Sequence, residues 1–363
     1  MEKNVVQYLC FVARCLILQF FARRKDATMK QLRIGIIGCG RISVMHFEAA
    51  VDLEEAILVA CADVKPERAE EKAEKYGIVA YTDYKKMIAR EDLDVVQICL
   101  PHYLHSEVAI YAMEQGLDVI TEKPMDVDVA SAERAIAVSR ATGRKFGVIS
   151  QCRYNDSAQL VKKAVQSGKL GRILSARSTL TWSRSDDYYS HSDWKGTWDK
   201  EGGGVVIDQA IHSIDLVRFI VDDEVESVSC NMANRRHKIV DVEDSAEGFI
   251  TFKNGTTYGF WCMNNYSCDE PIEIRLNCER GKVVFGYNEA KIQYKDGTVE
   301  EVKKAPQTFK GKDYWGNWHV RQLSNFYRAC LDLEPLEIDG EEALKTHKLI
   351  CRIYDEGGMR PKA

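Results

Sequence analysis

The sequence has little proline, no excess of positive charge and no charge-free hydrophobic run of membrane length. Seven of the 363 residues are proline, 45% are hydrophobic and 29% are charged, a composition that excludes disordered, collagen-like and low-complexity proteins. The formal net charge of -5 excludes a broad cationic surface for nucleic acid or anionic lipid. We therefore expect a soluble globular protein that acts on a small molecule and has neither nucleic-acid nor membrane partners.

The cysteines lack the paired C-x-x-C spacing that is typical of zinc and redox sites. The chain has 12 cysteines, and several lie inside apolar runs such as Ile98–Leu100 and Trp261–Met263. This placement favours reduced thiols in the core and a cytoplasmic location.

The segment nearest to a membrane span is residues 5–21, close to the amino terminus. Arg14 interrupts this segment, and a cation at the centre of a membrane helix costs roughly 2.5 to 3.5 kcal/mol. No small-residue cleavage site follows, and Met29–Arg33 leads directly into a strand-like run. We interpret residues 1–29 as a dispensable extension; an amphipathic docking helix and a membrane anchor are the less favoured alternatives.

The remaining chain is long enough for two domains, which we place at 30–150 and 151–363. The first alternates short apolar runs with segments of helical periodicity, a pattern that predicts right-handed β-α-β units in a doubly wound parallel sheet. We expect its strands at 34–37, 57–61, 95–100, 119–120 and 146–149.

The second domain has a different pattern and is expected to be α+β. Asn254-Gly255 and Asp296-Gly297 each separate two extended runs, and both dipeptides suit tight turns between antiparallel strands. Ile272–Leu276 alternates with period two, as expected for a sheet strand. Helices are predicted at about 156–166, 205–221, 318–331 and 341–353.

A glycine-rich turn lies between the first predicted strand and the first helix. Gly38 permits the tight turn, Gly40 allows the backbone to approach a pyrophosphate, and Ser43 fills the third small position. Asp63 follows the next strand, where a carboxylate can accept both adenosine ribose hydroxyls and would repel a 2′-phosphate. The motif therefore predicts NAD; NADP is the less favoured alternative and stays open because Lys65 could contact a 2′-phosphate.

Two further motifs carry polar groups that can do chemistry. Lys123 and Pro124 follow the strand at 119–120, so the ammonium is expected to point toward the cofactor cleft, and the bond before Pro124 is a candidate for cis. After three glycines, Asp208, His212 and Asp215 are spaced i, i+4 and i+7 on one helix face. The alternatives are a solvated loop cation and an ordinary polar helix face; the single histidine there predicts no catalytic metal.

These motifs, in this order, resemble the glucose-fructose oxidoreductase / inositol dehydrogenase / rhizopine catabolism (Gfo/Idh/MocA) family from about Lys30 to the end. The resemblance rests on the glycine-rich turn, Asp63, and the segments 101–105, 122–124, 151–154 and 208–212. It implies an α/β fold with a Rossmann domain followed by an α+β domain, whose large, mostly antiparallel open sheet mediates homo-oligomerisation. It also implies an NAD(P)-dependent dehydrogenase of CH-OH groups.

The same resemblance implies the site residues. Its catalytic trio matches Lys123, Asp208 and His212. His212 is the preferred base with Lys123 as the alternative, Lys123 holds the reacting oxygen, and Asp208 orients either His212 or the substrate. The family usually has Asn where this chain has His102. Cofactor contacts are expected from Gly38, Cys39, Gly40, Arg41, Ile42, Asp63, Leu100, Pro101, His102, His105, Glu122, Lys123 and Trp198, and substrate contacts from Lys123, Arg153, Tyr154, Trp182, Asp208 and His212.

Aromatic residues in the second domain indicate a sugar or glycoside, because aromatic faces stack on pyranose rings. The segment 188–198 is too polar to be all core and is expected to cover the site as a loop. The chain looks like gut-bacterial relatives that oxidise the C3 hydroxyl of glucosides, including C-glucosides. The alternatives are an NAD-dependent glycosidase acting through transient C3 oxidation, a myo-inositol or cyclitol dehydrogenase, and a silent sugar sensor. The aromatic residues are Trp182, Tyr188, Tyr189, Trp194, Trp198, Tyr314, Trp315 and Trp318.

Overall fold

The computed structural model describes residues 30–303 and 318–361. The predicted extension at 1–29 and the aromatic residues Tyr314 and Trp315 lie outside these ranges.

The first sheet confirms the predicted doubly wound fold. Its six strands are ordered β3-β2-β1-β4-β5-β6, and every pair is parallel. All five predicted strands are present, and β3 is an additional one that the apolar pattern did not reveal. The bounds are β1 Leu32–Ile37, β2 Ala56–Ala62, β3 Val79–Tyr81, β4 Val95–Ile98, β5 Asp118–Thr121 and β6 Phe146–Val148.

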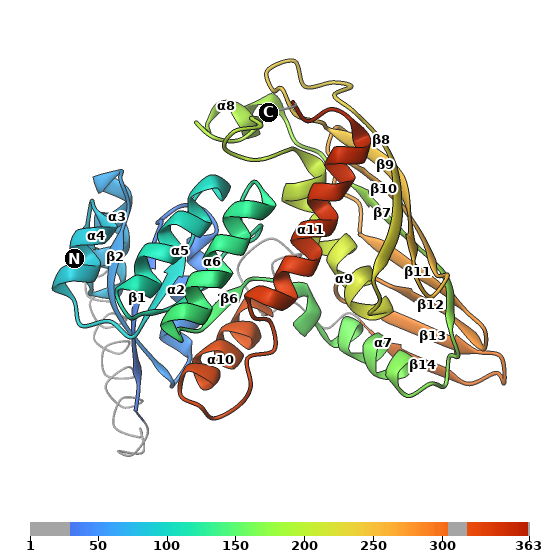
Figure 1. The fold of residues 1–363 in the computed structure, drawn as a ribbon, viewed down its shortest axis with the longest axis horizontal. Helices are drawn as coiled ribbons and strands as arrows, with labels where there is room; N and C mark the ends of the chain where they lie inside the picture. Colours follow the sequence, from blue (N-terminus) through green and yellow to red (C-terminus); the bar gives the residue numbers. More distant parts are fainter. Residues whose placement is uncertain (1–29, 304–317, 362–363) are drawn as a thin grey trace, which may run out of the picture.

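The helices between these strands are crossovers of the β-α-β type (Figure 1). Two of them begin at an Asp whose side chain accepts a backbone N–H of the first turn, Asp83 for α4 and Asp128 for α6, which satisfies a donor that the helix leaves unpaired. Asn155 and Asp339 cap two helices of the second domain in the same way. The helices are α2 Ser43–Asp52, α3 Pro66–Tyr76, α4 Tyr84–Arg90, α5 His105–Glu114 and α6 Val129–Thr142.

The second sheet has eight strands in the order β14-β13-β12-β11-β7-β10-β9-β8. β7 and β10 pair in parallel and the other neighbours are antiparallel. The predicted turns at Gly255 and Gly297 join β9 to β10 and β13 to β14. The bounds are β7 Ile173–Thr181, β8 Val225–Ala233, β9 Ser245–Phe252, β10 Thr257–Met263, β11 Glu273–Cys278, β12 Gly281–Phe285, β13 Ala290–Tyr294 and β14 Val299–Val302.

One face of this large sheet is covered by helices, and Figure 1 shows α7, α9 and α11 between it and the parallel sheet. The helix expected at 205–221 differs from the prediction: a π-helix, η3 Val206–Ala210, precedes α9. A π-helical turn is wider than an α-turn and is frequent at functional sites. The other bounds are α7 Asp156–Gln166, α8 Asp186–Ser190, α9 Ile211–Val221, α10 Trp318–Cys330 and α11 Gly340–Gly357, with short 3₁₀ turns η1 His102–Leu104 and η2 Gln151–Tyr154.

A continuous apolar cluster links the two sheets. It contains Ile98 and Val119 of the parallel sheet, Ile250 and Phe260 of the large sheet, and Tyr354 of α11. The loops beyond β4, β5 and β6 and the start of α9 are thereby fixed against a shared core. Among the described helices, none combines the length and the apolar character that a bilayer crossing requires.

Candidate active site beyond the carboxyl ends of the parallel strands

The glycine-rich turn between β1 and α2 has the shape that a dinucleotide requires. Gly38 has φ of 93°, and a Cβ there would lie 2.3 Å from the carbonyl oxygen of Cys99. A Cβ on Gly40 would meet nothing within 4 Å, so the backbone there is open to an approaching pyrophosphate. The cradle therefore fits NAD. Arg41 is exposed and Ile42 is half-buried beside the turn.

Asp63 lies at the end of β2 and connects the turn to the expected ribose position. Its Oδ2 accepts the backbone N–H of Cys39 at 2.8 Å, and its Oδ1 accepts that of Lys65 at 2.9 Å. These two bonds fix the carboxylate at the tip of β2, where a ribose hydroxyl can donate to it.

The loop after β4 brings the two predicted histidines near the Lys123–Pro124 turn. His102 is buried, its Nδ1 lies 2.7 Å from the carbonyl oxygen of Glu201, and its Nε2 lies 4.0 Å from Asp208 Oδ1. The ring nitrogens of His105 lie 2.6 Å from the Pro124 carbonyl and 2.8 Å from that of Leu100. His105 thus ties the two loops together.

Lys123 and Asp208 contact each other although 85 residues separate them. Lys123 Nζ donates to the backbone carbonyl of Asp208 at 2.6 Å and to its Oδ1 at 3.1 Å. The peptide bond before Pro124 is cis. Burial raises the pKa of Asp208, but the ammonium groups of Lys195 and Lys123 outweigh it and hold that pKa well below the usual value. Asp208 is therefore ionised at neutral pH.

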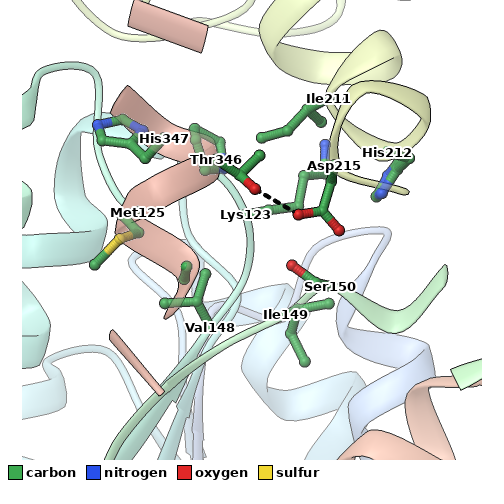
Figure 2. Close-up of a pocket in the computed structure, with 12 residues that line it drawn as sticks. Lys123, Met125, Val148, Ile149, Ser150, Ile211, His212, Asp215, Thr346 and His347 are labelled. Carbon is green, nitrogen blue, oxygen red and sulfur yellow. Dashed lines mark hydrogen bonds between the residues drawn. The ribbon is translucent and has the colours of Figure 1, made fainter. Parts of the chain in front are cut away.

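His212 lines a pocket together with Lys123 and Asp215 (Figure 2). Ile149 and Ser150, after β6, form another side of this pocket. The sequence argument names His212 as the preferred base, a role that suits an imidazole with its ordinary pKa near neutrality. Instead, burial and then the nearby Lys123 ammonium lower the pKa of His212 to about 3. The imidazole is neutral at working pH, so it is available as a proton acceptor, although weakly basic in the ligand-free chain.

Glu122 lies in a closed polar cluster with His46 and His319. Its Oε1 lies 3.0 Å from His46 Nε2 and 3.3 Å from His319 Nε2, while its Oε2 accepts the N–H of Lys123. Burial raises the pKa of Glu122, but the hydrogen bonds from the two imidazoles hold it well below its usual value. The three ligand atoms lie within 4.8 Å of one another, so the cluster has the donors of a metal site. In this structure the cluster fixes the side chain of Glu122, the residue directly before Lys123.

Arg153 has partners that differ from the substrate contact predicted for it. It is buried, with Nε at 2.7 Å from Asp215 Oδ2 and Nη1 at 2.8 Å from Glu342 Oε1. The guanidinium thus pairs with the buried Asp215 and the half-buried Glu342, which gives Arg153 a structural role. A substrate contact of Arg153 stays a prediction.

Three aromatic residues that were predicted to contact a ligand, Tyr154, Trp182 and Trp198, form hydrogen bonds within the protein through their polar atoms. Tyr154 donates from its hydroxyl to Asn325 at 3.2 Å. The indole N–H groups of Trp182 and Trp198 donate to backbone carbonyls at 3.1 and 3.0 Å. Trp182 and Tyr154 are buried, whereas Trp198 is half-buried. A contact of these rings with ligand stays a prediction.

The segment 186–201, which contains α8, lies against Asp208. It supplies Tyr188, which the sequence argument named among the aromatic residues of the expected loop, and Lys195, which that argument did not assign to the site. Tyr188 donates from its hydroxyl to Asp208 Oδ2 at 2.9 Å, and Lys195 Nζ lies 2.9 Å from the same oxygen. Gln209 Nε2 completes the set at 2.7 Å. The one signal for Lys195 in the sequence was a cation among tryptophans in a segment too polar for the core.

The chain matches known proteins along most of its length. Residues 32–150 match the oxidoreductase family with an NAD-binding Rossmann fold, and residues 158–284 match the GFO/IDH/MocA C-terminal domain. The myo-inositol 2-dehydrogenase of Thermotoga maritima is 31% identical over 330 residues, which are 86% of this chain and 92% of the relative. The D-glucoside 3-dehydrogenase of Escherichia coli is 29% identical over 361 residues, which are 92% of this chain and 98% of the relative.

A solved structure shares the fold as well as sequence. The WlbA dehydrogenase of Bordetella pertussis, in complex with NADH and UDP-GlcNAcA, superposes with a TM-score of 0.79 at 28% identity. The match covers 90% of this chain and 97% of that one.

Proposed function

The chain belongs to the GFO/IDH/MocA oxidoreductase family, the NAD-dependent dehydrogenases of sugars and polyols, and from this premise we propose its reaction. It transfers a hydride between NAD and a secondary alcohol of a sugar or glycoside. In its specific form, the reaction is oxidation of the C3 hydroxyl of a glucoside to the 3-keto product.

The observation that carries the proposal is the convergence of Lys123, Asp208 and His212 beyond β5. Lys123 Nζ lies 3.1 Å from Asp208 Oδ1, and His212 lines the same pocket as Lys123. Removing a hydroxyl proton requires an unprotonated base, and a fixed cation stabilises the oxygen as it loses that proton. The pocket supplies both.

Each residue then has a defined task. Lys123 donates a hydrogen bond to the reacting oxygen, and the neutral imidazole of His212 accepts the proton. Asp208 keeps Lys123 in place through its carboxylate and its backbone carbonyl. NAD, when bound at the glycine-rich turn, supplies the hydride acceptor. Burial and the nearby Lys123 ammonium lower the pKa of His212, so the imidazole stays unprotonated until it accepts the proton of the substrate.

Two observations support a glucoside as the substrate. The D-glucoside 3-dehydrogenase relative matches nearly the full length of both chains, and the aromatic segment 186–201 lies against Asp208. A cyclitol such as myo-inositol is the second candidate, because the Thermotoga maritima relative is a myo-inositol 2-dehydrogenase.

The test is a panel of glucosides, free sugars and cyclitols assayed with NAD, with NADH absorbance and keto-product mass spectrometry as separate readouts. We expect 3-keto glucosides and stoichiometric NADH. Product with cleaved glycoside and no net NADH would indicate the NAD-dependent glycosidase instead, and oxidation of cyclitols alone would identify a cyclitol dehydrogenase. No product and no NADH with any compound would contradict the proposal.

Two variants test the assignment of the residues. Lys123→Ala and His212→Ala should lower kcat by about a hundredfold or more, because general acid–base groups contribute that much. His212→Ala should bind NADH as the wild-type protein does, and Lys123→Ala should keep most of that affinity, since the glycine-rich turn is untouched in both. Wild-type turnover in both variants would remove these residues from the mechanism.

A further inference from the structure

The geometry points to Lys195 as a positioning residue for the reaction, and this inference rests on the proposed function. Lys123 binds Oδ1 of Asp208, and Lys195 binds the other carboxylate oxygen, Oδ2. We call this second contact the Lys195 clamp, because it keeps Asp208 ionised and in one orientation. The segment 186–201 is therefore part of the machinery of the site as well as its cover.

The contacts of Asp208 divide its two oxygens between the two lysines. Oδ1 accepts from Lys123 at 3.1 Å, whereas Oδ2 accepts from Lys195 at 2.9 Å and from the Tyr188 hydroxyl at 2.9 Å. Gln209 Nε2 also donates to Oδ2, at 2.7 Å. A carboxylate with several donors on fixed elements has little freedom to rotate.

Lys195 is itself held by its surroundings. Its Nζ lies 3.1 Å from Oε1 of Glu201, a buried residue whose Oε2 accepts the N–H of Gly196 at 2.5 Å. The ammonium also lies 4.3 Å from the ring centroid of Trp194 and 5.0 Å from that of Tyr188, distances at which cation–π attraction operates. Lys195 therefore cannot leave Asp208 without breaking several contacts.

The clamp explains how Lys123 can serve the substrate. Two of its hydrogen bonds go to Asp208, and a hydroxyl that enters the pocket must compete for its donors. When Lys123 turns toward that oxygen, the half-buried carboxylate of Asp208 would take up a proton or swing away if no second cation were present. Lys195 prevents both, so Asp208 keeps its charge throughout the reaction.

The first experiment compares wild type, Lys195→Met and Lys195→Arg in the pH dependence of kcat. Without Lys195 the pKa of Asp208 rises toward its ordinary value. Because the ionised form is the one that positions Lys123, the acidic limb of the profile should move to higher pH. We expect kcat to fall about a hundredfold, the loss associated with slight misplacement of reacting groups, and Lys195→Arg to restore part of it.

Lys162 offers a matched control. It is a buried lysine whose Nζ lies 3.0 Å from Asp222 Oδ2 and 4.5 Å from the ring of Phe219. Lys162→Met removes the same kind of ion pair outside the site and should lower the melting temperature without moving the pH profile. A wild-type profile in Lys195→Met, or an equal shift in Lys162→Met, would overturn the inference.

A second experiment needs no substrate and so separates this inference from the proposed function. The melting temperatures of wild type, Lys195→Met, Asp208→Asn and the double variant form a cycle. We expect Lys195→Met to cost less stability in the Asp208→Asn background, because the carboxylate it neutralises is gone. Additive shifts would refute the clamp. Failure of the substrate panel with a coupled cycle would refute the proposed reaction and leave the clamp in place.

Discussion

At the residue scale, Asp63 shows how one carboxylate combines a structural and a recognition role. Its oxygens accept the N–H groups of Cys39 and Lys65, which fixes it next to the glycine-rich turn. A ribose hydroxyl that donates to this carboxylate adds a charge-assisted hydrogen bond, whereas a 2′-phosphate meets a like charge. We therefore expect Asp63 to favour NAD over NADP.

We predict that Asp63→Ala weakens NADH binding about tenfold to a hundredfold, the loss of one hydrogen bond to a charged group, and leaves NADPH binding unchanged or tighter. Asp83 is a matched control because its Oδ1 accepts the N–H of Lys85 at 2.9 Å, as Asp63 does for Lys65. Calorimetric titration of both variants with both nucleotides measures the effect. Equal losses for NADH and NADPH in Asp63→Ala would contradict it.

At the scale of elements, the glycine-rich turn between β1 and α2 contains two glycines with different reasons for being there, one from the fold and one from the nucleotide. Gly38 is needed by the fold, because its φ is 93° and a Cβ would collide with the carbonyl of Cys99. Gly40 has no such constraint from the chain itself, since a Cβ there meets nothing within 4 Å. Close approach of a pyrophosphate to the backbone would account for a glycine at this position.

Gly40→Ala should therefore keep the wild-type melting temperature and bind NADH at least tenfold more weakly, because the new methyl group enters the space of the pyrophosphate. Gly38→Ala should weaken NADH binding and, unlike Gly40→Ala, should also lower the melting temperature. Thermal unfolding and NADH titration on the same samples distinguish the two variants. Wild-type affinity in Gly40→Ala would show that the nucleotide does not approach this turn closely.

Elements were predictable where their signal is local. The strands of the parallel sheet, the helix at Asp156–Gln166 and both hairpins follow from periodicity and turn residues. β3 was missed because it has three residues and its first, Val79, is 46% exposed, so it lacks the apolar run of a buried strand. The π-helix at Val206–Ala210 was missed because polar spacing alone does not distinguish it from an α-helix.

Residues of the candidate site could be named from the sequence only where they belong to a local motif. Lys123, Asp208 and His212 were named from their spacing and from the resemblance. The approach of His319 to Glu122 and of Lys195 to Asp208 depends on how distant elements pack, and no local pattern encodes that packing. The same applies to Arg153, whose partners Asp215 and Glu342 come from α9 and α11.

At the scale of the whole molecule, the large sheet has a face that the helices do not cover (Figure 1). Phe249 and Trp261 are 70% and 43% exposed on β9 and β10. Phe249 pairs with Gly259 and Trp261 with Glu247, so both rings point to the same side of the sheet. We propose that this face forms the contact in a homo-oligomer, because adjacent exposed aromatics mark protein interfaces.

The double variant Phe249→Glu/Trp261→Glu should then dissociate into a smaller species, because like charges would be buried across the contact. Light scattering coupled to gel filtration measures the mass. Leu333→Glu is the control, since Leu333 is 50% exposed and lies between α10 and α11, away from the sheet. An unchanged mass in the double variant would place any contact elsewhere.

The most direct test of the whole account is a crystal structure of the protein with NADH and a glucoside that it oxidises. We predict the C3 hydroxyl oxygen within hydrogen-bond distance of both Lys123 Nζ and a ring nitrogen of His212, with the C3 carbon facing the nicotinamide. A glucoside seated beyond reach of both side chains, or a nicotinamide bound away from the end of β5, would contradict the account.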